Sequence, residues 1–302
     1  MLLKKRTESE ELVGLRYLNT RMELAAKDKF HLSNLEKGYR GETEFDLLTE
    51  NLSEERYIID DLLLQVNNSY FQIDKVIISV GLIHLLDVKY HEGDYYLESE
   101  KLYHMKSNRE FKNPVIQLKR SETLFRQLLQ NLKLNYLVQA AVVFNNPEFT
   151  LYQAPKDLPI ILPTQINRFL KELNETPSKL DENHKILAHK LLSLHHVKNP
   201  FTTLPPYDYD QLEKGMYCRA CGSFNTSIKI RHLICGKCGN SASAEQSIVK
   251  QIEEFKVLFP DRKITTQSIY EWCNIEINKR RITRVLKKFY TPKGTTSDTY
   301  YE

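Results

Sequence analysis

The amino-acid sequence predicts an α/β protein with a mixed sheet flanked by helices, followed by a small cysteine-bearing module and a basic helical module. Three observations carry this prediction. Helical and strand-like periodicities alternate through the first 175 residues. Two Cys-x-x-Cys pairs follow a proline-bearing stretch. Residues 279–288 contain six basic and no acidic side chains.

The composition limits the classes of protein that this chain can represent. A chain of 302 residues with 41% hydrophobic residues can bury a substantial core. The formal net charge of +4 is too small to mark the whole chain as a polyanion binder, so any nucleic-acid signal must be local. The start turns polar too soon for a signal peptide, and no run of about 18 uncharged apolar residues follows. We therefore expect a cytoplasmic protein without membrane contact.

The predicted core domain spans residues 38–175, after an N-terminal helical segment at 1–37. In that segment, residues 7–25 have a helical period, and Thr7 and Glu10 have the spacing of a capping box. A second helix is expected to begin near Gly41. The remaining predicted elements are a meander of strands at 57–64, 71–79 and 82–89, a helix at 114–132, a strand at 136–144, a short strand near 150, and a helix at 163–173.

Charged residues interrupt the two apolar strands on either side of Val80-Gly81. Gly81 permits the positive φ of a tight hairpin turn. If Val80 and Gly81 form the loop, Ser79 pairs with Leu82 and Asp74 lies directly opposite Asp87. Lys89 lies two residues beyond Asp87, and therefore on the same face of the sheet.

Two carboxylates across a ladder repel one another unless a positive charge lies between them. Such carboxylates can share a Mg²⁺ ion, and a neighbouring ammonium can orient water or stabilise charge on a phosphate. The alternative is a solvated face with an Asp–Lys pair, because a loop shift of one residue would move Asp74 off the face.

The order and spacing of several short motifs resemble the nuclease-related domain (NERD) family. These motifs are Gly41-Glu42, Gln72-Ile-Asp74, Gly81-Leu-Ile, Asp87-Val-Lys89, Gly93 and Asn113-Pro-Val-Ile-Gln117. That family belongs to the PD-(D/E)xK superfamily, so the resemblance implies a restriction-endonuclease-like core over roughly residues 38–175.

The resemblance also implies roles for five residues. Asp74 and Asp87 would bind a divalent metal, with Glu42 as a third carboxylate, and Lys89 would position water. Gln117 would complete the pocket. Many members have Glu where this chain has Asp87. Taken alone, Glu42 and Gln117 read as exposed helix residues, Glu42 favouring the helix dipole.

The four paired cysteines predict a structural zinc ribbon at residues 213–243. Cys218, Cys221, Cys235 and Cys238 satisfy a tetrahedral Zn²⁺ completely, which leaves no open position for catalysis. A strand is expected over Ser227–Ile234, and His232 is expected at the surface or facing nucleic acid. The fifth cysteine, Cys273, is expected to be a buried small hydrophobe.

A helix-turn-helix-like module is predicted at residues 244–290, after a helical and proline-bearing connector at 176–212. Its helices are expected from Ala244, after an N-cap at Thr265 or Thr266, and from about Asn278. The tail at 291–302 is expected to be disordered. Ile282, Val285, Leu286 and Phe289 should be buried, leaving Lys279, Arg280, Arg281, Arg284, Lys287 and Lys288 for DNA.

Together these features predict a nuclease that uses Mg²⁺ or Mn²⁺ and carries structural Zn²⁺. DNA is the preferred substrate, and RNA stays open as an alternative. A second hypothesis is a nucleic-acid-binding regulator with an inactive nuclease fold. The basic helix can also be an ordinary solvated surface. The mode of cleavage, endo or exo, and the oligomeric state do not follow from these patterns.

Overall fold

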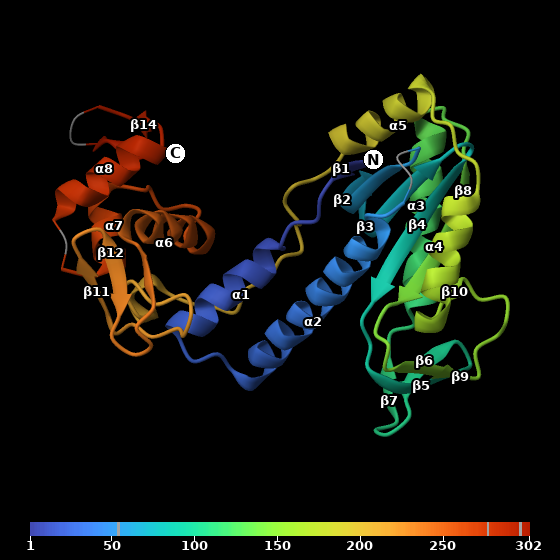
Figure 1. The fold of residues 1–302 in the computed structure, drawn as a ribbon, viewed down its shortest axis with the longest axis horizontal. Coiled ribbons are helices and arrows are strands. Elements are labelled where there is room, and N and C mark those ends of the chain that lie inside the picture. Colours follow the sequence, from blue (N-terminus) through green and yellow to red (C-terminus); the bar gives the residue numbers. More distant parts are fainter. Residues whose placement is uncertain (53–54, 277, 296–297) are drawn as a thin grey trace. The chain divides into compact units, whose positions relative to one another are not determined.

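The computed structural model describes residues 1–52, 55–276, 278–295 and 298–302 (Figure 1). The chain divides into two compact units. Unit 1 comprises Met1–Glu8 and Asn34–Pro200, and unit 2 comprises Ser9–Ser33 and Phe201–Glu302. The predicted α/β class is confirmed. The N-terminal segment, expected to be one helical region, contributes to both units.

Unit 1 is built on a mixed six-stranded sheet. Its middle strands form the expected antiparallel meander, and the following strand returns parallel to the third of them. A strand at the very start of the chain, within the region expected to be helical, pairs in parallel at the edge. The order is β1 (Leu2–Lys4), β2 (Tyr57–Val66), β3 (Ser69–Ser79), β4 (Leu82–Lys89), β8 (Leu137–Phe144) and β10 (Ile160–Ile161).

A second, four-stranded sheet lies within unit 1. Of these strands, the sequence predicted only β9 near Thr150. The others are short and mostly exposed, with few buried side chains to mark a period. The order is β7 (Arg109–Phe111), β6 (Lys101–His104), β5 (Gly93–Glu98) and β9 (Phe149–Tyr152).

Apolar clusters cover both faces of the six-stranded sheet. Val76 and Leu85 belong to the cluster that includes α3 (Pro114–Asn131) and α5 (Glu182–Ser193). Ile77 and Leu86 belong to the cluster that includes α2 (Ala26–Thr49) and α4 (Ile166–Glu175). α5 is thus part of the unit 1 core, although it was expected in a connector. Strand alternation then assigns Asp87, two residues after Leu85, to the face that α3 covers. At Asp74 the alternation is interrupted, because Ile73 and Val76 belong to the same cluster.

Two helix starts differ from the sequence prediction. α1 (Glu10–Arg21) begins after Ser9, whose Oγ accepts a hydrogen bond from the Leu12 N–H at 3.2 Å, so Thr7 is not the cap. α2 begins at Ala26 rather than near Gly41. Its first half is mostly exposed, so no apolar period marks it in the sequence.

Unit 2 combines a small three-stranded sheet with helices. The strand expected over Ser227–Ile234 is instead a hairpin that turns at Ile230, where φ is 54°. The three basic-module helices begin where they were predicted. The elements are β11 (Thr226–Lys229), β12 (His232–Cys235), β13 (Ser241–Ser243), α6 (Ala244–Leu258), α7 (Thr266–Cys273) and α8 (Lys279–Phe289).

The described part of the tail is ordered, contrary to expectation. β14 (Pro292–Lys293) pairs with β15 (Tyr300–Tyr301), and the Tyr301 N–H donates to the Ile264 carbonyl. Tyr301 is buried, so an aromatic side chain anchors this end of the chain. Within the described ranges, no helix combines the length and apolar character needed to cross a bilayer.

A buried arginine lies at the centre of unit 2. Arg21, the last residue of α1, forms an ion pair with the fully buried Glu254 of α6. Its Nη2 donates to Gln251 Oε1 at 2.6 Å, and its Cζ lies 3.8 Å from the centroid of the Trp272 ring. These contacts make the N-terminal helix part of the unit 2 core.

Replacing Arg21 by Met should destabilise unit 2 by about 3–5 kcal/mol, because Glu254 would lose its main buried charge partner. The measurement is urea unfolding of the full chain. The exposed substitution Lys27→Ala should change stability by less than about 0.5 kcal/mol. Adding Glu254→Met to Arg21→Met should recover stability, and a further loss in the double variant would contradict this account.

Candidate active site and metal centre

The β3–β4 hairpin has the predicted loop and register. Val80 and Gly81 form the turn, Gly81 has a φ of 68°, and Ser79 pairs with Leu82. The regular pairing runs as far as Lys75 and Leu86, and Asp74 and Asp87 are the next residues on the two strands. The register prediction is therefore confirmed over this stretch.

Asp74, Asp87 and Lys89 converge at the open end of this hairpin. Lys89 Nζ donates to Asp87 Oδ1 at 2.8 Å, and the Val88 N–H donates to Asp74 Oδ2 at 2.7 Å. Asp87 Oδ2 is buried and has no hydrogen-bond partner among the described residues. A buried carboxylate oxygen without a donor fits a metal ligand, because a cation would offset its desolvation.

The pKa values of two carboxyl groups are raised because these groups are buried close to a third. Burial, reinforced by the Asp74 charge, raises the pKa of Asp87 to about 7. Burial and the Asp74 charge also raise the pKa of Glu42 to about 8. Burial opposes the charged form of Lys89, but the charges of Asp87 and Asp74 raise its pKa. These carboxyl groups favour a proton or a cation over an unpaired negative charge.

Glu42 joins this cluster from α2, where it lies in the second half of a long helix. Gly41, beside it, packs so close to Tyr90 that any side chain at residue 41 would overlap that ring. The Gly41 carbonyl also accepts a hydrogen bond from Asn145 Nδ2 at 2.8 Å. The close approach of helix and strand explains why glycine precedes Glu42. The first-turn role considered for Glu42 does not apply.

Arg6 is a site residue that sequence reasoning missed. Its guanidinium donates from Nη1 to Glu42 Oε2 at 2.8 Å, from Nε to Asp46 Oδ2 at 2.8 Å, and from Nη2 to the Asp74 carbonyl at 2.7 Å. Burial lowers its pKa, but the hydrogen bond to Asp46 and the charge of Glu42 raise it overall. No local motif marks Arg6, because its partners lie 36 to 68 residues away.

Gln117 is not brought into the cluster. It lies in the first turn of α3, is exposed, and makes no hydrogen bond to the acidic cluster among the described residues. The structure thus assembles Glu42, Asp74, Asp87 and Lys89, and leaves Gln117 at the surface.

The four paired cysteines come together in unit 2. Their Sγ atoms all lie within 4.8 Å of one another. Cys218 Sγ is 3.7 Å from Cys238 Sγ, and Cys221 Sγ is 3.6 Å from Cys235 Sγ. A tetrahedral Zn²⁺ with bonds of about 2.3 Å separates its sulfur ligands by about 3.8 Å. The spacing of the thiols therefore fits a structural zinc ion.

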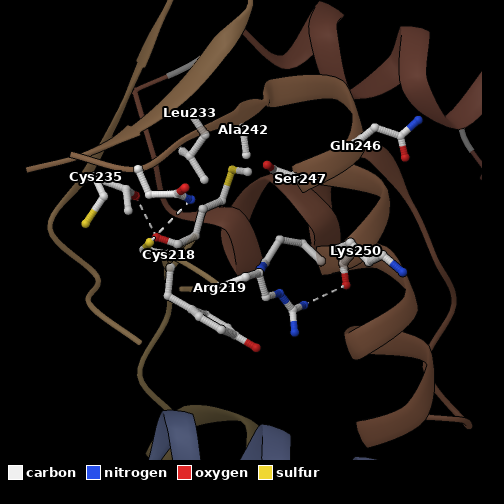
Figure 2. A pocket seen from close by; sticks show the side chains of 13 residues that line it. Cys218, Arg219, Leu233, Cys235, Ala242, Gln246, Ser247 and Lys250 are labelled. Atoms are coloured by element: carbon white, nitrogen blue, oxygen red, sulfur yellow. Dashed lines mark hydrogen bonds between the residues drawn. The ribbon is translucent and has the colours of Figure 1, made fainter. Parts of the chain in front are cut away.

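The cysteine cluster packs on α6. Figure 2 shows Cys218, Cys235 and Leu233 facing Gln246 and Ser247 across a small cavity of about 150 Å³. Asn240 Nδ2 lies 3.8 Å from Cys218 Sγ, where it can donate to a thiolate. His232 is exposed, as expected. The fifth cysteine, Cys273, is fully buried, as expected, and is not a member of this cluster.

The basic helix α8 carries its six cations in different environments. Ile282, Val285 and Leu286 are buried as predicted, but Phe289 is 42% exposed because it lies at the last turn. Two of the lysines have partners on other helices: Lys279 Nζ donates to Gln267 Oε1 at 2.7 Å, and Lys288 forms an ion pair with Glu245 at 2.6 Å. Arg281 Nη1 donates to the Ile230 carbonyl at 2.9 Å. The side chains of Arg280, Arg284 and Lys287 make no hydrogen bond or ion pair with the described residues.

In the metal-free protein, the raised pKa of Asp87 gives a specific pH dependence. The folded state binds the proton more tightly than the unfolded state, so stability is greatest below pH about 4 and falls as pH rises to about 7. Asp87→Asn should therefore be more stable than the parent at pH 8, and equal to it at pH 4. Unfolding should be followed without added magnesium, with the exposed substitution Asp94→Asn as control. An equal difference in stability between Asp87→Asn and the parent at pH 4 and at pH 8 would contradict this explanation.

The zinc assignment predicts about one zinc ion per purified chain. Cys221→Ser should abolish this stoichiometry, because three thiolates and a hydroxyl hold zinc poorly. Cys273→Ala provides a matched control, since Cys273 is buried outside the cluster. Metal content should be measured by elemental analysis. Retention of zinc in the Cys221 variant would count against the assignment.

Residues 37–145 match the family model described as nuclease-related domain, NERD. This range contains Glu42, Asp74, Asp87 and Lys89, and it excludes Arg6, the four paired cysteines and α8. No curated protein and no solved structure matches the chain. The segment from residue 37 to 145 is thus similar to the nuclease-related domain.

Proposed function

We propose that the protein is a metal-dependent nuclease that hydrolyses phosphodiester bonds at the Asp74–Asp87–Lys89 cluster. The observation that supports this most directly is the buried Asp87 Oδ2, which lacks a donor beside a second carboxyl group and an ammonium. A purely structural ion pair would not need a second carboxyl group there. The match to the nuclease-related domain supports the same conclusion.

Asp74, Asp87 and Glu42 would hold a Mg²⁺ or Mn²⁺ ion through carboxylate oxygens. When bound, such an ion lowers the pKa of a coordinated water and offsets charge on the phosphate. Lys89, fixed by Asp87, would orient the attacking water and stabilise negative charge on the phosphate oxygens.

Arg6 and Gln117 would have different roles. Arg6 holds Glu42 and the Asp74 backbone together, so we assign it a positioning role. Gln117, on the helix covering the same face of the sheet, would reach the cluster only through a change of rotamer or through substrate. Its catalytic role is retained as a proposal from the family resemblance.

Unit 2 would deliver the substrate. We propose that zinc holds the ribbon in shape and that α8 contacts DNA, with RNA as an alternative substrate. None of the five cysteines forms a disulfide in the described structure, and Cys-x-x-Cys pairs that hold a metal are typical of reducing compartments, which supports a cytoplasmic location.

Hydrolysis should depend on Mg²⁺ or Mn²⁺, and Asp87→Ala and Lys89→Ala should each lower its rate at least about a hundredfold. Linear, circular and single-stranded DNA, and RNA, should be incubated with the full chain and the products separated by gel electrophoresis. Asp94→Ala removes an exposed carboxylate elsewhere and should cut at the parental rate. Equal rates in all variants would defeat the catalytic assignment. No cleavage of any substrate by the parent would favour the inactive nucleic-acid-binding regulator.

A further inference from the structure

A concave groove in unit 2 is formed by the ribbon hairpin and the first turns of α8. Its volume is about 620 Å³. The ribbon contributes the turn residues Ile230 and Arg231 together with Ser243, and α8 contributes three arginines. The residues that line it are Ile230, Arg231, Ser243, Glu245, Asn278, Arg280, Arg281, Arg284 and Val285.

The charge of this groove is strongly positive. Four guanidinium groups face one carboxylate, that of Glu245, and Lys288 pairs with this carboxylate at 2.6 Å. The side chains of Arg231, Arg280 and Arg284 make no hydrogen bond or ion pair with the residues that the structure describes. Arginines gathered in a hollow without acidic partners repel one another, so the groove is arranged for an anionic ligand.

Hydrogen bonds hold the two sides of the groove, the ribbon turn and the start of α8, in place. Arg281 Nη1 donates to the Ile230 carbonyl at 2.9 Å, and the Ala244 N–H donates to the Arg231 carbonyl at 2.9 Å. These bonds hold the ribbon turn beside the start of α8. The N-terminus of α8, where Asn278 caps the Arg280 N–H, adds the positive end of the helix dipole to the groove.

Ile230 gives the groove an apolar edge. Its side chain is 89% exposed, and its backbone has a φ of 54°, which is unfavourable for a β-branched residue. Strained backbone of this kind persists where the surroundings hold it in place and is frequent at binding sites. An exposed apolar side chain next to guanidinium groups suits a ligand with alternating charged and apolar parts, as in the phosphates and sugars of a nucleic acid.

We infer that this groove binds the phosphodiester backbone of a nucleic acid, with Arg231 of the ribbon and Arg280 and Arg284 of α8 contacting phosphates together. The inference deepens the proposed function, since it rests on nucleic acid being the substrate. It differs from a basic helix acting alone, because the ribbon supplies a contact. Lys287, on the same helix, does not line the groove.

The test measures binding of fluorescein-labelled duplex DNA, single-stranded DNA and RNA by anisotropy, from 50 to 200 mM salt. The full-length zinc-loaded protein is used without added magnesium, so that binding is read without cleavage. Arg231→Ala and Arg284→Ala should each weaken binding about five- to tenfold and lower the salt slope by about 1. Lys256→Ala removes an exposed cation of α6 that does not line the groove, and it should change the affinity less than about twofold. Arg231→Lys keeps the charge and should recover part of the loss.

Unchanged affinity in Arg231→Ala, with normal zinc content and circular dichroism, would overturn the inference. Equal losses in the Arg231 and Lys256 variants would also overturn it, because they would indicate a diffuse effect of charge. So would a failure of the parent to bind any of the three nucleic acids. Weaker binding in the groove variants alone supports the inference, and the nucleic acid that binds most tightly identifies the class of ligand. Asp87→Ala separates the two proposals, because it should bind normally even though its cleavage is lost. If the groove variants lose binding and the parent cleaves nothing, the inference about the groove is supported and the proposed nuclease activity is refuted.

Discussion

Asp74 and Asp87 lie just beyond the last paired residues of the β3–β4 ladder, and the candidate site in unit 1 depends on how their negative charge is compensated. Two neighbouring negative charges repel one another strongly in the low dielectric constant of a protein interior. Lys89 offsets part of the charge from the same strand, and Arg6 reaches in from the start of the chain to Glu42 and the Asp74 backbone. The pKa values of Asp87 and Glu42, raised by burial and by Asp74, show that this compensation is incomplete. In the proposed function, a divalent cation would complete this compensation.

The sequence was most informative where the chemistry is local. The hairpin register followed from one glycine and from strand alternation, and the cluster of four cysteines followed from their spacing. Reasoning failed where long-range pairing decides the structure. β1 and Arg6 act on partners far along the chain, which no local pattern specifies. The first half of α2 was missed because exposed helices carry no apolar period. The role of Gln117 stays a prediction from the family resemblance, since the structure shows only that its side chain is exposed.

The cations of α8 illustrate the difference between a charge pattern and a binding surface. In the sequence, the six residues form one equivalent set. In the structure, Lys279 and Lys288 have polar partners on other helices, and Arg281 donates a hydrogen bond to the ribbon turn at Ile230. Arg280 and Arg284 remain turned to the groove, where Arg231 joins them. Affinity for a polyanion depends on the cations that lack partners, so composition alone overstates the number available.

The placement of α1 in unit 2 has a consequence for the order in which the protein can fold during synthesis. α1 is synthesised before α6, and Arg21 lies 230 residues before Gln251, its partner in α6. Leu12, Leu15 and Leu18 are almost completely buried in the folded protein, but during synthesis they precede the helix on which α1 packs. Unit 2 therefore cannot complete its core until α6 has been made, and before that point α1 presents an apolar face that is prone to aggregation.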